Sequence, residues 1–400
     1  MKNRLIKTVL KASILIICPI FQLSHAAESL PVIKNHPIDK LVPKSMNLMQ
    51  NASVNKQKNI NMRIMHIDLD YVFDANKKQQ ESNINQLIKR IKTIQPNTIF
   101  LQAFADPDAN GSSNAVYFQN RYIPVRDNIF PDVLRKIRQE TQVQRVFAWM
   151  PLIAWEFPTK YKVQYVEHST GKNQGYIRIS PFDERNVQYV SDIFKDFIQN
   201  NPVDGILYHD DITLSDFEDY SSIAQTTYQN WGFNTHEIFK ERKDHTPLAK
   251  YKTAYLDKFA EGISKIVKAD HPNLLTARNM YASVTIKPIS ENWMSQSMAS
   301  TYKHYDFNAI MAMPYMEGAK DHKQFYLDLI RESKKFDPSL DRTIFELQAV
   351  DWKTNKKIPT SEIVSTIQLL ENNGVKHIGY YPDDFVASHP EADKIKQVWK

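Results

Sequence analysis

The sequence Asp204-Gly-Ile-Leu-Tyr-His-Asp-Asp211 places a short apolar run directly before a cluster of polar and acidic side chains. Continuous apolarity over so few residues is typical of a β-strand that is covered on both faces, as in a parallel sheet. Loops that follow such strands carry functional side chains in many α/β proteins. This combination, repeated along the chain, decides the predicted fold.

Seven further apolar runs share these properties, and most of them also precede a polar or acidic residue. The eight runs are Met62–Leu69, Thr98–Ala105, Arg145–Pro151, Gly205–Tyr208, Leu274–Tyr281, Ala309–Pro314, Thr343–Leu347 and His377–Tyr381. Segments between them show helical periodicity, as in the stripe Ile84, Leu87, Ile88, Ile91 and Ile94. Alternation of strand and helix predicts an α/β protein with one domain, a (β/α)8 TIM-like barrel over residues 61–400.

A doubly wound sheet is the main alternative fold, and it predicts a glycine-rich phosphate turn after the first strand. The chain has 9 glycines and none near Leu69, which disfavours that fold. Two long connections, Glu156–Ile179 and Ile212–Thr246, follow the third and fourth strands. In a barrel they lie on the catalytic face, where loops form the substrate cleft.

The N-terminal segment has the pattern of a secretory signal peptide over residues 1–26. Four basic residues precede the first acidic residue, an apolar run follows over Ala12–Leu23, and Ser24-His25-Ala26 offers a cleavage site near Ala26. We therefore expect an exported protein, periplasmic or secreted. Without those four residues, 47 basic side chains face 45 acidic ones, so the net charge of +6 largely disappears and no nucleic-acid partner is expected.

The single cysteine, Cys18, lies inside the apolar run of the expected signal peptide. Ile17 before it is larger than the residue that precedes a lipidated cysteine, so we expect a free protein, with a lipid anchor as the alternative. The processed chain would contain no thiol, which suits an oxidising compartment. Residues 27–60 are polar and rich in Lys and Asn, and they predict a linker or arm.

Acidic and aromatic side chains dominate the predicted strand ends. We expect catalysis by Asp210, Asp211 and Glu346. The expected substrate-binding residues are Asp68, Asp70, Tyr71, His209, Trp155, Tyr315, Glu317, Trp352, Tyr381 and Asp383.

Cleavage of a glycosidic bond requires a carboxylic acid that protonates the leaving oxygen and a second group that stabilises or attacks the cationic centre. Sugars also stack their apolar faces on aromatic rings. A glycosidase satisfies both patterns, although metal-dependent hydrolases and aldolases also place carboxylates at barrel mouths. The histidines lack zinc-site spacing, so no metal or other cofactor is expected, with a carboxylate-only Mg²⁺ or Ca²⁺ site as the alternative.

Crowding of charge at His209-Asp210-Asp211 predicts a raised pKa for one of the two acids, as a general acid requires. The sequence leaves open which of them it is. Glu346 ends an apolar strand, where a buried acid needs a partner or a role, and it is the expected second carboxylate.

Several ordered motifs, together covering nearly all of residues 61–400, resemble the C-terminal half of the PgaB family of poly-β-1,6-N-acetyl-D-glucosamine N-deacetylases. The motifs are Ile67-Asp-Leu-Asp-Tyr71, Leu101-Gln-Ala-Phe-Ala-Asp-Pro-Asp108, Phe147-Ala-Trp-Met-Pro151, Asp204-Gly-Ile-Leu-Tyr-His-Asp-Asp211, Ser215-Asp-Phe-Glu-Asp219, Ala312-Met-Pro-Tyr-Met-Glu317 and Phe345-Glu-Leu-Gln-Ala-Val-Asp-Trp352. The resemblance implies a barrel that binds and cleaves partially deacetylated poly-β-1,6-N-acetylglucosamine, a biofilm exopolysaccharide, as a metal-independent endo-glycosidase. It also implies a catalytic acid within His209-Asp210-Asp211.

The chain departs from that family at its N-terminus. Family members carry a metal-dependent deacetylase domain there, whereas about 34 residues separate the expected cleavage site from the predicted barrel. Deacetylase activity is therefore not expected. A non-catalytic module that binds the same polymer and guides it toward export machinery of the outer membrane is the alternative function.

Overall fold

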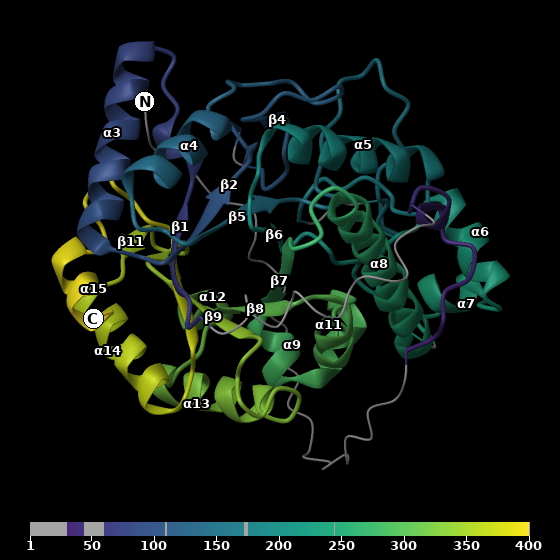
Figure 1. The fold of residues 1–400 in the computed structure, drawn as a ribbon. Coiled ribbons are helices and arrows are strands. Elements are labelled where there is room, and N and C mark those ends of the chain that lie inside the picture. The colour runs from purple at the N-terminus through teal and green to yellow at the C-terminus, as the bar shows by residue number, and fades with distance from the viewer. Residues whose placement is uncertain (1–29, 44–59, 109, 172–174, 244, 400) are drawn as a thin grey trace.

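The computed structural model describes residues 30–43, 60–108, 110–171, 175–243 and 245–399. Within these residues, parallel strands close into a barrel in which each strand pairs with its neighbour in the chain and the last returns to the first (Figure 1). The barrel strands are β1 (Arg63–Ile67), β2 (Thr98–Gln102), β5 (Arg145–Met150), β6 (Gly205–Tyr208), β7 (Leu275–Tyr281), β8 (Phe307–Ala312), β9 (Thr343–Gln348) and β12 (His377–Tyr381). The predicted (β/α)8 barrel is confirmed.

Helices surround the barrel and bury the apolar stripes that the sequence shows (Figure 1). They include α3 (Lys77–Ile94), α4 (Phe130–Glu140), α5 (Glu184–Asn200), α8 (His245–Lys268), α11 (Met298–His304), α13 (His322–Ser333), α14 (Thr360–Asn372) and α15 (Ala392–Val398). Helix α3 begins where the Asn76 side chain accepts hydrogen bonds from two backbone amides, and it ends at Gln95 in the left-handed conformation. Its buried side matches the predicted stripe.

Short helices and strands lie in the connections that follow the carboxyl ends of the barrel strands. They are α2 (Leu69–Val72), β3 (Phe104–Ala105), β4 (Ala115–Val116), α6 (Ser222–Asn230), α7 (Thr235–Phe239), α9 (Ala282–Ile286), η3 (Pro288–Ser290), α10 (Glu291–Met294), α12 (Pro314–Glu317), β10 (Val350–Asp351) and β11 (Lys356–Lys357). The second long connection predicted from the sequence therefore contains helices α6 and α7.

The interior of the barrel is filled by side chains from alternate strands. The part of the interior nearer the amino ends of the strands is apolar. There β1, β5, β7 and β9 contribute Ile64, Phe147, Ala277 and Ile344. The next inward positions of these same four strands form what we call the polar layer: His66, Trp149, Asn279 and Glu346. All four are buried, so the barrel changes from apolar to polar just beneath its carboxyl-terminal mouth.

Strand β6 starts at the one residue type that fits its position. A Cβ atom on Gly205 would lie 2.3 Å from the Phe147 ring and 2.9 Å from the carbonyl oxygen of Leu275. Glycine therefore allows β6 to approach both neighbouring strands, which positions the His209-Asp210-Asp211 segment that follows.

Residues 30–43, which we call the strap, pack on the outside of helix α8. The strap contains the short helix η1 (Pro37–Lys40), and its His36 ring lies 4.0 Å from the Tyr255 ring. Ile38 packs where Gly262 leaves room, because a Cβ atom there would lie 2.1 Å from Ile38 Cγ1. Lys258 pairs with Asp39 at 2.7 Å.

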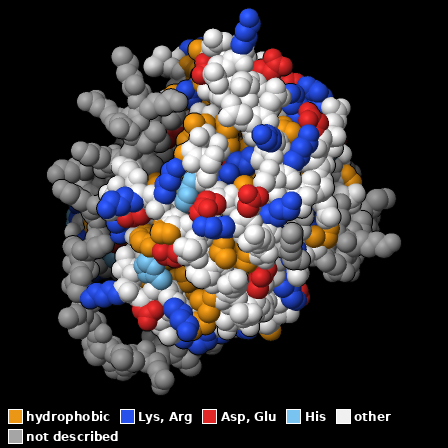
Figure 2. Space-filling view, turned by 90° about the vertical axis from the view of Figure 1, so that its left-hand side faces the viewer, with side chains coloured by type: hydrophobic (Ala, Val, Ile, Leu, Met, Phe, Trp, Pro, Cys, Tyr) orange, Lys and Arg blue, Asp and Glu red, His pale blue; other side chains and the backbone are white. Residues whose placement is uncertain are grey.

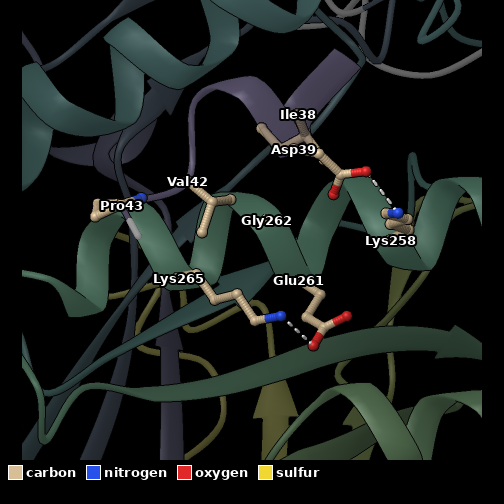
Figure 3. A pocket seen from close by; sticks show the side chains of 8 residues that line it. All are labelled: Ile38, Asp39, Val42, Pro43, Lys258, Glu261, Gly262 and Lys265. Carbon is tan, nitrogen blue, oxygen red and sulfur yellow. Dashed lines mark ion pairs between the residues drawn. The ribbon is translucent and has the colours of Figure 1, made fainter. Parts of the chain in front are cut away.

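A cavity of about 220 Å³ lies between the strap and α8. Figure 3 shows the side chains that line it. The described part of the predicted arm is thus packed on the barrel. The rest of that arm and the predicted signal peptide lie outside the described residues.

The face shown in Figure 2 carries acidic and basic side chains in alternation, with small, separate apolar areas. Lys92 and Glu140 form one exposed ion pair on the protein surface, with their nitrogen and oxygen 3.0 Å apart. In the described part of the chain, every helix is too short or too polar to span a bilayer.

Candidate active site

Aromatic and acidic side chains from several strands meet at the mouth of the barrel. The Trp149 ring lies 4.9 Å from the His209 ring and 5.5 Å from the Tyr381 ring, and Tyr381 in turn lies 5.9 Å from Trp352. The Tyr381 hydroxyl donates a hydrogen bond of 3.2 Å to Asp68. Four of the predicted substrate-binding residues, Asp68, His209, Tyr381 and Trp352, are therefore brought together.

Asp210 is the acid that contacts His209 and two tyrosine hydroxyls at this mouth, and the residue is 7% exposed. Its Oδ2 accepts hydrogen bonds from the hydroxyls of Tyr281, at 2.6 Å, and Tyr176, at 3.0 Å. His209 Nδ1 lies 3.0 Å from Oδ1. Burial raises the pKa of Asp210, but His209 and the two hydroxyls outweigh it and hold the pKa below its usual value. Asp210 is therefore ionised at neutral pH.

The pKa of His209 shifts in the opposite direction to that of Asp210. Burial lowers the pKa of the His209 imidazole, whereas the charges of Asp210 and Asp211 raise it, and the net pKa lies above the ordinary value. The pair thus favours an imidazolium beside a carboxylate. Sequence reasoning missed Tyr176 because it lies in a long connection with no local signal, and it left Tyr281 outside the expected site although Tyr281 ends a barrel strand.

Asp211 differs from its neighbour in its surroundings, which do not favour its expected catalytic role. Its side chain is fully buried, and its two oxygens accept hydrogen bonds from the backbone amides of Leu152, Ile153 and Ala154 at 2.5 to 3.2 Å. Burial raises the pKa of Asp211 although these amides oppose the shift. The carboxyl group holds the chain after β5 in place and has no face toward a substrate.

Glu346 lies in the polar layer beneath the mouth. Its Oε1 makes a short contact with His66 Nδ1, and its Oε2 accepts a hydrogen bond of 2.8 Å from Asn279 Nδ2. The side chain is 2% exposed, so the expected role of Glu346 as second catalytic carboxylate does not match its position. It instead orients His66, which sequence reasoning missed although His66 shares its strand face with Asp68.

Asp68 follows β1 and is 9% exposed. Burial, together with the negative charge of Asp70, raises its pKa to about 8, although the Tyr381 hydroxyl opposes the shift. Tyr71 lies near this carboxyl and is half-buried. Burial and Asp68 raise the pKa of the Tyr71 phenol, so both groups are neutral at pH 7.

Asp70 is held by other side chains. It accepts hydrogen bonds of 2.5 Å from the Tyr117 hydroxyl, 2.6 Å from Arg126 and 3.0 Å from Gln102. Its charge is therefore balanced by Arg126, and Asp70 remains at the rim as a neighbour of Asp68.

Two predicted binding residues are structural instead. Trp155 is fully buried, and its indole nitrogen donates a hydrogen bond of 3.1 Å to the carbonyl oxygen of Leu152, so no ring face is free for a sugar. Asp383 is 1% exposed and forms a buried ion pair with Arg90 at 2.7 Å. Sequence spacing could not reveal the ion pair of Asp383, because Arg90 lies 293 residues away in the chain.

Tyr315 and Glu317 lie in helix α12 on the rim. The Tyr315 hydroxyl donates to Glu362 at 2.9 Å, and Glu317 accepts a hydrogen bond of 3.1 Å from the backbone amide of Ser283. Burial raises the pKa of Glu317. A binding role for both residues stays a prediction. Within the described ranges, no group of three or more His, Cys, Asp or Glu side chains is arranged to hold a metal ion.

The two tryptophans give a direct test of this site. We expect Trp352→Ala to weaken binding of a β-1,6-linked glucosamine oligosaccharide by about 3- to 10-fold, because one stacked ring contributes about 0.5–1.5 kcal/mol. Trp155→Phe should leave affinity unchanged and lower the melting temperature, because Trp155 packs in the core. Titration calorimetry and thermal unfolding of both variants measure this, and reversed effects would contradict the assignment.

Comparisons with known proteins agree with this architecture. The sequence model of hypothetical glycosyl hydrolase family 13 matches residues 66–381 of this chain. The poly-β-1,6-N-acetyl-D-glucosamine N-deacetylase of Escherichia coli K12 is 41% identical over 347 residues, which cover 84% of this chain and 52% of that protein. The chain thus spans about half the length of that curated relative.

Solved structures extend the comparison. The glycoside hydrolase domain of PgaB (BpsB) from Bordetella bronchiseptica is 38% identical with a TM-score of 0.80, and the match covers 84% of this chain and 98% of that domain. An α-L-fucosidase from Paenibacillus thiaminolyticus, 11% identical with a TM-score of 0.57, shares the fold over 85% of this chain and 49% of its own.

Proposed function

Because the chain belongs to hypothetical glycosyl hydrolase family 13, we propose that it is an endo-glycosidase that cleaves partially deacetylated poly-β-1,6-N-acetyl-D-glucosamine. Two relatives, a deacetylase of this polymer and a PgaB glycoside hydrolase domain, support the substrate. The deacetylase name belongs to a protein of which the match covers 52%, so we propose glycoside cleavage and not deacetylation.

The observation that carries the proposal is the state of Asp210. A glycosidase needs a carboxylate beside the anomeric carbon, where positive charge develops in the transition state. The hydroxyls of Tyr176 and Tyr281 fix the Asp210 carboxylate, and its lowered pKa keeps it ionised. Two tyrosines and one histidine therefore preorganise a negative charge at the mouth, as electrostatic stabilisation requires.

The surroundings of Asp210 suit a chain of glucosamine and N-acetylglucosamine units. Free amines of glucosamine are cationic, and the ionised carboxylate of Asp210 at the mouth attracts them. Trp352 and Tyr381 are partly exposed at the same rim and offer rings on which sugars stack. We propose that neighbouring sugar units occupy the mouth and the loops around it.

In this reaction Asp210 takes the role of the ionised carboxylate. The sequence led us to expect that Asp210 or Asp211 donates the proton. The ionised state of Asp210 and the backbone hydrogen bonds of Asp211 do not suit that role. The Glu346–His66 pair supports the floor of the site. We further propose that catalysis needs no metal ion and that the protein acts after export, in the periplasm or outside the cell.

The proposal predicts that the purified chain shortens defined, partially deacetylated β-1,6-linked oligomers. Mass spectrometry should detect internal cleavage products, at the same rate with and without a chelator such as EDTA. Fully acetylated oligomers serve as the comparison for the role of free amines. Loss of activity with the chelator and its recovery with Mg²⁺ or Ca²⁺ would favour a carboxylate-metal hydrolase.

A carrier of the same polymer is the second candidate, because an aromatic and acidic mouth binds sugars whether or not it cleaves them. Oligomers that bind in titration calorimetry yet keep their length after prolonged incubation would support this alternative and overturn the glycosidase proposal. An interaction with outer-membrane export machinery is a proposal that belongs to this second function.

A further inference from the structure

The aromatic ring of Tyr176 lies directly against the backbone of Gly111, which is in the connection between β3 and β4. A Cβ atom on Gly111 would lie 2.2 Å from Tyr176 Cδ1 and 2.3 Å from Cε1, so the ring occupies the place that any other side chain would need. The hydroxyl of the same ring donates the hydrogen bond of 3.0 Å to Asp210 Oδ2. We propose that Gly111 is a positioning residue, whose lack of a side chain leaves room for the Tyr176 ring to reach Asp210. This inference rests on the proposed glycosidase function and deepens it.

Hydrogen bonds hold the turn that carries Gly111. The backbone amides of Asn110 and Gly111 donate hydrogen bonds of 3.1 and 2.8 Å to the carboxylate of Asp106. The Asn110 side chain donates a hydrogen bond of 2.7 Å to Glu156, in the connection after β5. Gly111 has a φ of +89°, in the left-handed region that favours glycine. Because the turn is tied at these points, a larger residue at position 111 would displace the Tyr176 ring.

Displacement of this ring changes the surroundings of Asp210. Of its two tyrosine partners, the carboxylate would keep the hydroxyl of Tyr281, at 2.6 Å. Both hydroxyls lower the pKa of Asp210, so the loss of one of them raises that pKa. The other ionisable groups at this place are His209, which contacts Asp210, and Asp211 and Asp106, whose charges act on His209. Without the Tyr176 hydroxyl, Asp210 should therefore take up a proton at a higher pH.

Two glycine variants of the full chain separate the ring contact from backbone strain. Gly111→Ala should lower kcat on partially deacetylated β-1,6-linked oligomers by about 10-fold at neutral pH, because a hydrogen bond to a charged group is lost. The matched control is Gly374→Ala. Gly374 has a φ of +86°, and no described atom lies within 4 Å of the place of its Cβ. The control should keep wild-type kcat, measured by mass spectrometry of the products. Equal kcat in both variants would overturn the proposal.

Tyr176→Phe tests whether Gly111 acts through the tyrosine hydroxyl, because it removes that hydroxyl and keeps the ring. Its kcat should fall by a similar factor, and the acid limb of its pH profile should move to higher pH, as in Gly111→Ala. The double variant should lose no more kcat than Tyr176→Phe alone. Losses that multiply in the double variant, or an acid limb that stays in place in either single variant, would contradict the assignment.

Thermal unfolding tests the contact independently of activity. In wild type, Gly111→Ala should lower the melting temperature by more than Gly374→Ala does. In a Tyr176→Ala background the ring is gone, so the two alanine substitutions should have equal effects, and a Gly111→Ala chain that does not fold alone should fold there. An undiminished effect of Gly111→Ala in that background would show that its Cβ does not meet the ring. A wild-type chain that leaves every oligomer intact would instead contradict the glycosidase function itself.

Discussion

Replacing Asp210 with asparagine is expected to lower kcat on β-1,6-linked oligomers by about 10³-fold or more, with a much smaller loss of affinity from the missing attraction for cationic amines. Asparagine keeps the size of the side chain and still accepts a hydrogen bond from Tyr281 or Tyr176. It cannot supply the negative charge that stabilises the transition state or take a proton from water. The loss should therefore appear in the chemical step.

Product release followed by mass spectrometry measures kcat, and titration calorimetry measures affinity. A matched control is Asp132→Asn on the outer surface of α4, where the side chain is 62% exposed and pairs with Arg135. This control should retain wild-type kcat. An Asp210→Asn variant that keeps more than about a tenth of wild-type kcat would remove the central support for the proposed mechanism.

The largest effect on stability is expected from Arg278→Met. Arg278 lies on β7 with no exposed surface, and its guanidinium donates to Asp257 at 2.8 Å and to the carbonyl oxygen of Ile212 at 2.6 Å. Removing the cation leaves the fully buried Asp257 carboxylate with only hydroxyl donors from Ser300 and Tyr305. Breaking a buried ion pair on one side typically lowers the free energy of unfolding by about 3–5 kcal/mol.

Urea-induced unfolding followed by circular dichroism gives this quantity. Lys40→Met is the control, because the Lys40 side chain is 67% exposed in its pair with Glu184, and surface pairs contribute at most about 1 kcal/mol. The double variant Arg278→Met, Asp257→Leu should recover part of the loss, since it removes the unpaired charge as well. Equal midpoints for Arg278→Met and Lys40→Met would show that the buried pair does not stabilise the fold.

The fold could be predicted from the sequence because barrel strands are short, continuous and apolar. The predictions for Gly205–Tyr208 and His377–Tyr381 match the structure at both ends. Strand β8 begins two residues earlier than predicted, at Phe307, because the polar Asn308 interrupts the apolar run. Its amide is buried against the sulfur atoms of Met280 and Met298, a partnership that no local pattern reveals.

The site was predicted less completely than the fold, because the role of an acidic residue depends on which groups its side chain contacts in the folded protein. Asp210 and Asp211 are neighbours in sequence, yet one meets tyrosine hydroxyls at the mouth and the other meets the backbone after β5. Glu346 was correctly expected to need a partner, and that partner, His66, is 280 residues away. Sequence spacing identifies the strand ends, but only the closed barrel decides which side chains share a surface.

The position of the strap determines where an affinity handle or a solid support on the N-terminal side of the chain would lie. It lies against residues 255–265 of α8, the half of that helix which leads away from the mouth toward the start of β7. An affinity handle or a solid support joined ahead of residue 30 would thus be held at the outer wall. The mouth at Asp210 would stay open to a polymer, so, on the proposed function, immobilised protein should cleave soluble chains as well as the protein in solution.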